Sequence, residues 1–334
     1  MQTVLLRSPT CHKTCGRKVE ERKKKSIEVG KKIFVTGVGG QLGHDVVNNA
    51  LKRGYQVWGS DIATEYSGVA DRSPVTKCVY QQLDITDKEA VERITTERKP
   101  DVIIHCAAWT AIDAAEDEEN EQRVYAINVD GTRYIAESAK RVDTKMLYLS
   151  TDYVFDGKGE RPWKPDDKNY APLNFYGQTK LEGEKAVSFS LDKFFIVRIA
   201  WVFGLNGKNF IKTMINAGKT QDTVKVVNDQ IGTPTYTLDL ARLLVDMVET
   251  EKYGYYHATN EGGYISWYDF CCEVYRQYGL FTEIIPVSTL EYGVSKTARS
   301  ENSRLDKSKL IENGFVQLPE WQDAVSRYLK EAKL

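Results

Sequence analysis

The fold of this chain is decided by the sequence KIFVTGVGGQLG at residues 32–43. A short apolar run, typical of a buried strand, leads into glycines, and apolar residues then recur at helical spacing as far as Leu51. The glycines let the turn close tightly and bring backbone N–H groups and the helix N-terminus up to a pyrophosphate. We predict that a dinucleotide binds there; the alternative is a close helix–strand crossing without a ligand. The predicted cofactor-binding residues of this turn are Gly37, Gly39, Gly40, Gln41, Leu42 and Gly43.

A carboxylate follows the second predicted strand at the spacing that a dinucleotide fold requires. Residues 56–60 form this strand, and Asp61 stands 24 residues after Gly37 (61 − 37). This position suits a carboxylate that holds an adenosine ribose. Asp84 and Ile85 follow the third predicted strand, where they either bracket an adenine or Asp84 caps the next helix.

Small side chains follow the fourth predicted strand. Residues 101–105 have the continuous apolar pattern of a buried parallel strand. Ala107 and Ala108 come next and permit the close approach of a cofactor. We interpret His105 as an interior histidine, and the acidic run at 116–119 as a solvated helix face rather than a cation site.

Repeated alternation of strands and helices predicts an α/β fold, a doubly wound parallel sheet of the Rossmann type with a smaller C-terminal lobe. Ligands of such sheets bind beyond the carboxyl ends of the strands. We assign residues 31–200 plus 236–258 to an NAD(P)-binding domain. Residues 201–235 plus 259–334 form the predicted substrate-binding lobe.

The composition is that of an ordinary globular protein, with 41% apolar residues, 28% charged residues and a formal net charge of −1. This balance gives no electrostatic reason to expect nucleic acid or a membrane surface as a partner. No apolar run approaches the roughly 18 residues of a membrane span. The cysteine spacings suit neither a disulfide framework nor a zinc site, which favours a cytoplasmic location.

Residues 1–30 differ in composition from the rest of the chain, because basic side chains crowd together between Arg17 and Lys25. The apolar cluster in this stretch is too short for a signal peptide. A patch for nucleic acid or anionic lipid is one interpretation. We favour a disordered extension.

A hydroxyl, a phenol and an amine stand at a suggestive spacing. The fifth predicted strand delivers Thr151, Tyr176 follows 25 residues later (176 − 151), and Lys180 lies one helical turn behind Tyr176. The same pattern of tyrosine and lysine recurs at Tyr292 and Lys296, but no strand delivers a hydroxyl to that copy. The context therefore selects Thr151, Tyr176 and Lys180 as the catalytic residues.

Seven segments match the motifs of one enzyme family. They are residues 37–43, 107–113, 150–157, 172–184, 198–204, 228–234 and 298–306. Through them the chain resembles the extended short-chain dehydrogenase/reductases, and most closely the dTDP-4-dehydrorhamnose reductases. The early segments are shared by the whole superfamily, and the later ones are specific to the reductases.

The resemblance implies transfer of a hydride from NADH or NADPH to C4 of dTDP-4-dehydro-6-deoxy-L-mannose. The product would be dTDP-L-rhamnose, for polysaccharide biosynthesis. Tyr176 would donate a proton to the developing alkoxide, Lys180 would lower the pKa of Tyr176 and hold the nicotinamide ribose, and Thr151 would hydrogen-bond the carbonyl. Related dehydratases follow their threonine with an Asp-Glu pair, whereas here Asp152 is followed by Tyr153. We therefore predict reduction without elimination of water.

The resemblance also suggests which residues contact the substrate. Trp201 either stacks on the ligand or packs in the core, and Arg299 either neutralises the diphosphate or forms a surface ion pair. The full set of predicted substrate-binding residues is Trp109, Thr151, Tyr153, Trp201, Asn209, Gln230 and Arg299.

Several alternatives stay open at this point. Some proteins similar to this family are non-catalytic, NAD(P)-binding regulatory subunits of methionine adenosyltransferase, and another nucleotide-linked 4-keto-6-deoxy sugar is a second candidate substrate. Asp61 slightly favours NADH, because a carboxylate repels a 2′-phosphate, although family members accept either cofactor. No sequence feature supports a Mg²⁺ site, so we predict no metal ligands and leave Mg²⁺ open. The expected state is a monomer or a homodimer.

Overall fold

The computed structural model describes residues 30–66, 77–293 and 297–334. The predicted basic extension over 1–30 lies outside these ranges except for its last residue. The turn-forming residues Ser67, Gly68 and Pro74 predict a loop over 62–77, most of which lies outside these ranges as well. Among the described residues, no helix is both long and apolar enough to cross a membrane.

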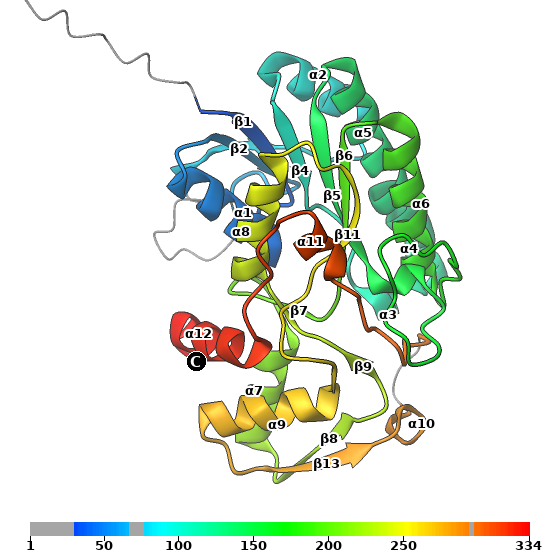
Figure 1. Ribbon diagram of the computed structural model, residues 1–334, viewed down its shortest axis with the longest axis vertical. Coiled ribbons are helices and arrows are strands. Elements are labelled where there is room, and N and C mark those ends of the chain that lie inside the picture. The colour runs from blue at the N-terminus through cyan, green and yellow to red at the C-terminus, as the bar shows by residue number, and fades with distance from the viewer. Residues whose placement is uncertain (1–29, 67–76, 294–296) are drawn as a thin grey trace, which may run out of the picture.

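A seven-stranded parallel sheet forms the centre of the molecule (Figure 1). In spatial order its strands are β11 (Gly254–His257), β6 (Phe194–Ile199), β5 (Lys145–Thr151), β4 (Val102–His105), β1 (Lys32–Thr36), β2 (Gln56–Asp61) and β3 (Val79–Gln82). The predicted doubly wound sheet is confirmed. The strand order reverses between β1 and β4, and ligands of open α/β sheets bind at such a reversal.

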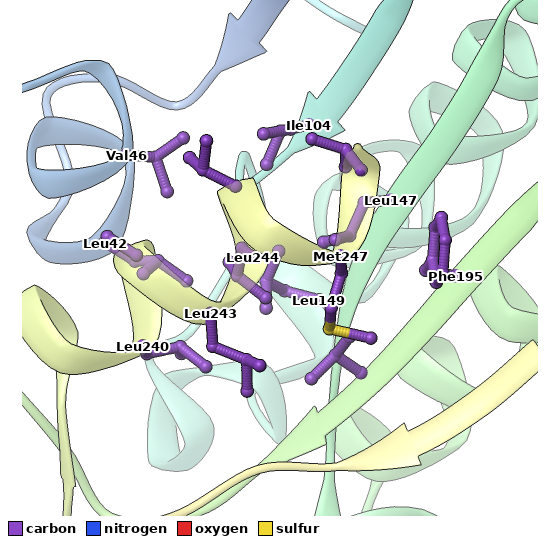
Figure 2. Close-up of a cluster of buried hydrophobic side chains, with 14 of the residues drawn as sticks. Leu42, Val46, Ile104, Leu147, Leu149, Phe195, Leu240, Leu243, Leu244 and Met247 are labelled. Carbon is purple, nitrogen blue, oxygen red and sulfur yellow. The ribbon is translucent and has the colours of Figure 1, made fainter. Parts of the chain in front are cut away.

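Helices cover both faces of the sheet (Figure 1). One face carries α1 (Gln41–Lys52) and α8 (Thr237–Val248), and the other carries α2 (Lys88–Arg98), α5 (Thr132–Arg141) and α6 (Phe175–Ser190). Figure 2 shows leucines of α8 packed against α1 and the sheet. Each such buried side chain contributes about 1.5–3 kcal/mol of hydrophobic free energy. These layers fix the glycine turn and the start of α6 relative to the sheet.

A second hydrophobic cluster supports the smaller lobe. It is built from α7 (Phe210–Thr220), β8 (Thr223–Val227), α9 (Trp267–Tyr278), β13 (Glu283–Val287) and α12 (Trp321–Ala332). Three two-stranded sheets complete the lobe: β8 with β13, β7 (Val202–Phe203) with β10 (Thr235–Tyr236), and β9 (Ile231–Gly232) with β12 (Ile265–Ser266). The domain boundaries remain a proposal, which the place of β11 in the main sheet and this separate cluster support.

Short helices connect the larger elements. They are α3 (Ile112–Ala115), α4 (Glu118–Tyr125), a π-helical turn at Ala126–Gly131, a 3₁₀ turn at Asp152–Val154, α10 (Thr289–Tyr292) and α11 (Ser308–Glu312). The sequence predicts one helix over 128–141, but its first residues belong to the π-helical turn and α5 begins only at Thr132. Within that turn Asn128 is buried and accepts a hydrogen bond from the backbone N–H of Trp109 at 2.8 Å.

Candidate active site

The carboxyl ends of the central strands open into two cavities. The larger, of about 800 Å³, is lined by Gly37, Thr151, Tyr176 and Lys180 among others, and it extends to the smaller lobe. The second, of about 500 Å³, lies beside Asp61 at the end of β2. Residues of the glycine turn line both cavities, so the two together have the extent that a dinucleotide and a second ligand require.

The glycine turn has the geometry of a phosphate-binding loop. Gly37 has a φ of +71°, and a Cβ there would lie 2.6 Å from the backbone nitrogen of Ala107. A Cβ on Gly43 would lie 2.2 Å from the carbonyl oxygen of Gly37. Helix α1 begins after Gly40 without a side-chain cap, which leaves its first N–H groups available to an anion. The residues therefore fit the pyrophosphate of a nicotinamide dinucleotide.

Asp61 lies at the end of the cleft where we expect the adenosine to bind. Its Oδ2 accepts a hydrogen bond from the backbone N–H of Gly39 at 2.9 Å, and its Oδ1 accepts one from Ile62 at 2.8 Å. Both oxygens are thus held in place and keep lone pairs for the hydroxyls of a ribose. Ala107, Ala108, Asp84 and Ile85 line the same cavity, as do three of the six predicted turn residues, Gly37, Gly39 and Gly40.

Asp84 does not cap the following helix, so that alternative is wrong. Its Oδ1 accepts hydrogen bonds from the backbone N–H and the hydroxyl of Thr86, at 2.9 and 2.7 Å. The cap of α2 is Asp87, which accepts a hydrogen bond from the backbone N–H of Ala90 at 2.9 Å. The reason is that α2 begins only at Lys88, so Asp87 and not Asp84 stands directly before its first turn.

Arg123 also lines the cavity beside Asp61, and the sequence reasoning missed it. It lies on α4, and its guanidinium carbon is 5.6 Å from the centre of the Trp109 ring. This stacking holds the side chain beside a cavity that otherwise carries the carboxylates of Asp61 and Asp84. The acidic run at 116–119 indicated a solvated helix face, so nothing in the sequence indicated that Arg123 would reach a cavity.

Tyr176 reaches the larger cavity from the first turn of α6. The helix starts there because the side chain of Asn174 accepts a hydrogen bond from the backbone N–H of Gly177 at 2.8 Å. Burial raises the pKa of Tyr176 above its usual value, and the charge of Asp152 adds to this effect, while the hydroxyl of Thr151 opposes it. The phenol is therefore protonated at neutral pH and able to donate a proton.

Lys180 is buried below Tyr176, with 3% of its side chain exposed. Its Nζ donates a hydrogen bond to the carbonyl oxygen of Leu149 at 2.7 Å and lies 4.1 Å from the centre of the Tyr148 ring. Burial lowers the pKa of Lys180 to about 7. Burial raises the pKa of Tyr176 itself, and the lowering of that pKa by Lys180 stays a prediction.

Asp152 is a residue of the site that the sequence reasoning did not select. It lines the larger cavity with 3% of its side chain exposed, and its Oδ1 accepts a hydrogen bond from the hydroxyl of Thr151 at 3.0 Å. Burial raises the pKa of its carboxyl group to about 6, against smaller opposing effects of the Ser303 and Thr151 hydroxyls. Its position directly after the predicted catalytic Thr151 could have identified Asp152 from the sequence.

Four of the predicted substrate contacts besides Thr151 line the larger cavity, namely Tyr153, Trp201, Gln230 and Arg299. Trp201 also stacks on Trp267, with ring centres 3.8 Å apart, so it combines the ligand-facing and the packing interpretations. Arg299 forms an ion pair with Asp113 at 2.6 Å beside the cavity. Gln230 donates a hydrogen bond to the hydroxyl of Thr289 at 3.0 Å.

Trp109 and Asn209 are not brought to either of these cavities in the described part of the chain. The indole N–H of Trp109 donates to the carbonyl oxygen of Ala111 at 3.0 Å, on the side where Arg123 stacks. Asn209 instead caps α7, where its side chain accepts a hydrogen bond from the backbone N–H of Lys212 at 3.1 Å. Its amide group also donates to neighbouring oxygens, which uses its hydrogen-bonding capacity within the fold.

The structure also shows where His105 and the second tyrosine–lysine pattern lie, and whether metal-ligating residues gather. His105 is buried between the hydroxyls of Thr36 and Thr132, as an interior histidine should be. Tyr292 lines the larger cavity, whereas Lys296 lies outside the described residues. No group of three or more histidine, cysteine, aspartate or glutamate residues suited to a metal ion occurs within the described ranges.

Known proteins share this architecture and sequence. Residues 31–334 match the family model described as the RmlD substrate binding domain. The spore coat polysaccharide biosynthesis protein SpsK of Bacillus subtilis is 35% identical over 90% of this chain and 97% of its own. A dTDP-4-dehydrorhamnose reductase of Aggregatibacter actinomycetemcomitans is 36% identical over 88% of this chain and 97% of its own.

A solved structure is similar over nearly the same range. The crystal structure of a dTDP-4-dehydrorhamnose reductase from Bacillus anthracis in complex with NADP aligns with a TM-score of 0.81 and 35% identity, over 90% of this chain and 99% of that one. The resemblance inferred from the sequence motifs is therefore confirmed. The chain belongs to the family of the RmlD substrate binding domain, which includes the dTDP-4-dehydrorhamnose reductases.

Proposed function

We propose that this protein is an NAD(P)H-dependent reductase that converts dTDP-4-dehydro-6-deoxy-L-mannose to dTDP-L-rhamnose. The observation that carries the proposal is that Thr151, Tyr176 and Lys180 line the same cavity as the glycine turn. The names of the relatives support the substrate, and the matches cover nearly the whole of both chains. A cytoplasmic location and a monomeric or homodimeric state belong to the same proposal.

The residues of the site divide the reaction between them. When bound, the reduced nicotinamide supplies a hydride to C4. Tyr176 donates its phenolic proton to the C4 oxygen, since its raised pKa keeps it protonated until charge develops there. Thr151 orients the carbonyl, and Lys180 holds the nicotinamide ribose from its buried position. Tyr153 has a pKa raised by burial to about 12, so it stays neutral and supplies no second carboxylate for elimination.

The proposal is tested by following NADH and NADPH oxidation with the 4-keto-L-sugar nucleotide and identifying the product by NMR. Tyr176→Phe should lower kcat by about 10²–10⁴-fold, because general acid catalysis contributes this much. Tyr134→Phe, on α5 and outside both cavities, is the matched control and should retain activity. Equal turnover by Tyr176→Phe would refute the catalytic assignment. Absence of reductase activity with stable binding to methionine adenosyltransferase would favour the regulatory alternative.

The cofactor preference rests on the carboxylate of Asp61. Because both of its oxygens are fixed by backbone N–H groups, the negative charge cannot swing away from a 2′-phosphate. We expect kcat/KM to be higher with NADH, and Asp61→Asn to raise kcat/KM for NADPH several-fold relative to NADH. An unchanged ratio in the variant would show that Asp61 does not set the preference. Mg²⁺ dependence is left to the same assay, run with and without a chelator.

A further inference from the structure

Glu116 turns away from the solvated face that was predicted for the acidic run at 116–119. The residue is partly buried, whereas Glu119 of the same run is exposed. Its Oε1 accepts a hydrogen bond from the backbone N–H of Phe175 at 2.8 Å, and the two residues lie 59 positions apart in the chain. Phe175 is the first residue of α6, and Tyr176 is the second. A distant carboxylate therefore holds the start of the helix that carries the proposed proton donor.

Two separate segments of the chain fix the first turn of α6. The first N–H groups of a helix have no partner within the helix, so they depend on groups from outside it. Asn174 accepts a hydrogen bond from the N–H of Gly177 at 2.8 Å, and its own amide group donates to the carbonyl oxygen of Ala298 at 3.1 Å. Glu116 binds the N–H of Phe175 from the segment between β4 and α4. The turn is thus held from two sides.

The segment that carries Glu116 also packs against the side chain of Tyr176. Ala115 at the end of α3 and Val124 of α4 form a buried apolar cluster with Tyr176. Hydrophobic contacts of this kind are non-directional, so they keep water out without fixing the exact position of the ring. The hydrogen bond between Phe175 and Glu116 is directional, and it supplies the precision that the apolar cluster lacks.

The rate of proton transfer depends on where the hydroxyl group of Tyr176 lies. A general acid must come within about 2.6–3.2 Å of the atom that it protonates. A displacement of about 1 Å is enough to lower a rate by about 100-fold. Because Phe175 and Tyr176 are adjacent, any shift of the first turn of α6 moves this hydroxyl group directly.

We propose that Glu116 is a positioning residue for the reaction, because it fixes the first turn of α6 through the N–H of Phe175 and thereby places the phenol of Tyr176. This inference rests on the proposed function and adds to it a residue that lines neither of the two cavities. Since Glu116 does not border the space for substrate or cofactor, its loss should lower kcat and leave KM nearly unchanged.

Three variants of Glu116 separate the reach of the side chain from its charge, which by itself also favours a helix N-terminus. Glu116→Gln keeps an acceptor oxygen at the same reach, so its kcat should stay within about 3-fold of the wild-type value. Glu116→Asp keeps the carboxylate on a side chain one methylene shorter, and Glu116→Ala removes the acceptor. These two should lower kcat by about 10- to 100-fold, the effect of a small misplacement. KM for the keto sugar should change by less than about 3-fold in all three.

Further measurements distinguish misplacement of Tyr176 from a general loss of structure. With a cofactor deuterated at the transferred position, the isotope effect on kcat in Glu116→Asp should be at least as large as in the wild type, because the chemical step then limits the rate. Cofactor affinity, measured by fluorescence titration, should be unchanged. Glu119→Ala removes an exposed carboxylate of the same run outside both cavities, and as the matched control it should keep wild-type kcat and KM. If Glu116→Ala does not fold, the Gln and Asp variants carry the test.

The possible outcomes separate this inference from the proposed function. Wild-type kcat in Glu116→Asp, a loss in Glu116→Gln as large as in Glu116→Asp, or a rise in KM that matches the fall in kcat would overturn the positioning role. Each of these results leaves an active wild-type reductase in place. A wild-type enzyme that does not reduce the keto sugar would overturn the proposed function, and the positioning role with it.

Discussion

Helix α6 buries two ionisable side chains, Lys180 and Glu184, whose hydrogen bonding differs. Lys180 and Glu184 lie one turn apart on α6, and both are almost fully buried. The carboxylate of Glu184 is bound by two nitrogens of Arg198, at 2.8 and 2.7 Å. Arg198 donates further to Pro165 and Tyr170, whereas the ammonium of Lys180 donates to the carbonyl oxygen of Leu149.

The protonation of the two groups follows from this difference. Burial lowers the pKa of Lys180 to about 7 because little compensates for its lost solvation. Burial would also lower the pKa of Arg198, but Glu184 and Tyr170 outweigh it and raise that pKa. A satisfied pair serves the fold, whereas incompletely satisfied groups such as Lys180 and Asp152 remain available to a ligand.

The largest stability effect should come from breaking the satisfied pair. Arg198→Met leaves the Glu184 carboxylate buried without its partner, which should lower the free energy of unfolding by about 3–5 kcal/mol. Urea denaturation of the variant and the wild type measures the difference. A loss below about 1 kcal/mol would mean that Glu184 finds another partner or water, and the contrast with Lys180 would then fail.

Removing the ammonium of Lys180 should change the free energy of unfolding in the opposite direction. Lys180→Met should raise the stability of the cofactor-free protein by about 2–4 kcal/mol at pH 7, because the lysine is protonated in the unfolded chain but loses solvation when buried. The folded pKa lies below the unfolded one, so this advantage is full below about pH 7 and shrinks as the pH rises towards 10. Denaturation at pH 6, 7.5 and 9 measures it, and a destabilised variant would contradict the interpretation.

Asp152→Asn should also stabilise the protein, by about 1–3 kcal/mol at neutral pH. The carboxyl pKa is raised to about 6 in the folded state, so ionisation of the wild-type residue opposes folding above that pH. As the pH falls from about 6 to about 4, folded wild-type protein takes up the proton and the difference disappears. A pH-independent difference between the two melting temperatures would show that packing, not charge, is responsible.

The smallest effect is expected at an exposed ion pair. Arg276 binds Glu273 at 2.6 Å, but 70% of its side chain is exposed to solvent. Arg276→Met should therefore leave the melting temperature unchanged within error, because solvent screens such pairs. It is the surface control for Arg198→Met, and a large loss would show that arginine substitutions destabilise this protein irrespective of burial.

Local sequence patterns were enough to predict the sheet and the core of the site. The apolar run at 32–36 and the glycines after it predict a strand and a turn through spacing alone, and Asp61 stands at the spacing predicted for a ribose-binding carboxylate. Tyr176 and Lys180 face one way because they lie one turn apart on a helix, a relation that depends on helical geometry only. A local pattern does not predict which of several possible partners a polar side chain binds. Asn209 was predicted to bind the substrate, but its side chain caps the start of α7.

The sequence by itself determined the α/β class, the dinucleotide turn and the three catalytic candidates, since each follows from the period of a strand or helix and from the chemistry of adjacent residues. Only the tertiary structure decided that Arg123 reaches the cavity beside Asp61, that the Trp109 indole donates to Ala111, and that Asp152 and Ser300 line one cavity. These outcomes depend on which distant segments meet and on whether each buried polar atom finds a partner there. Spacing along the chain carries no record of such long-range contacts.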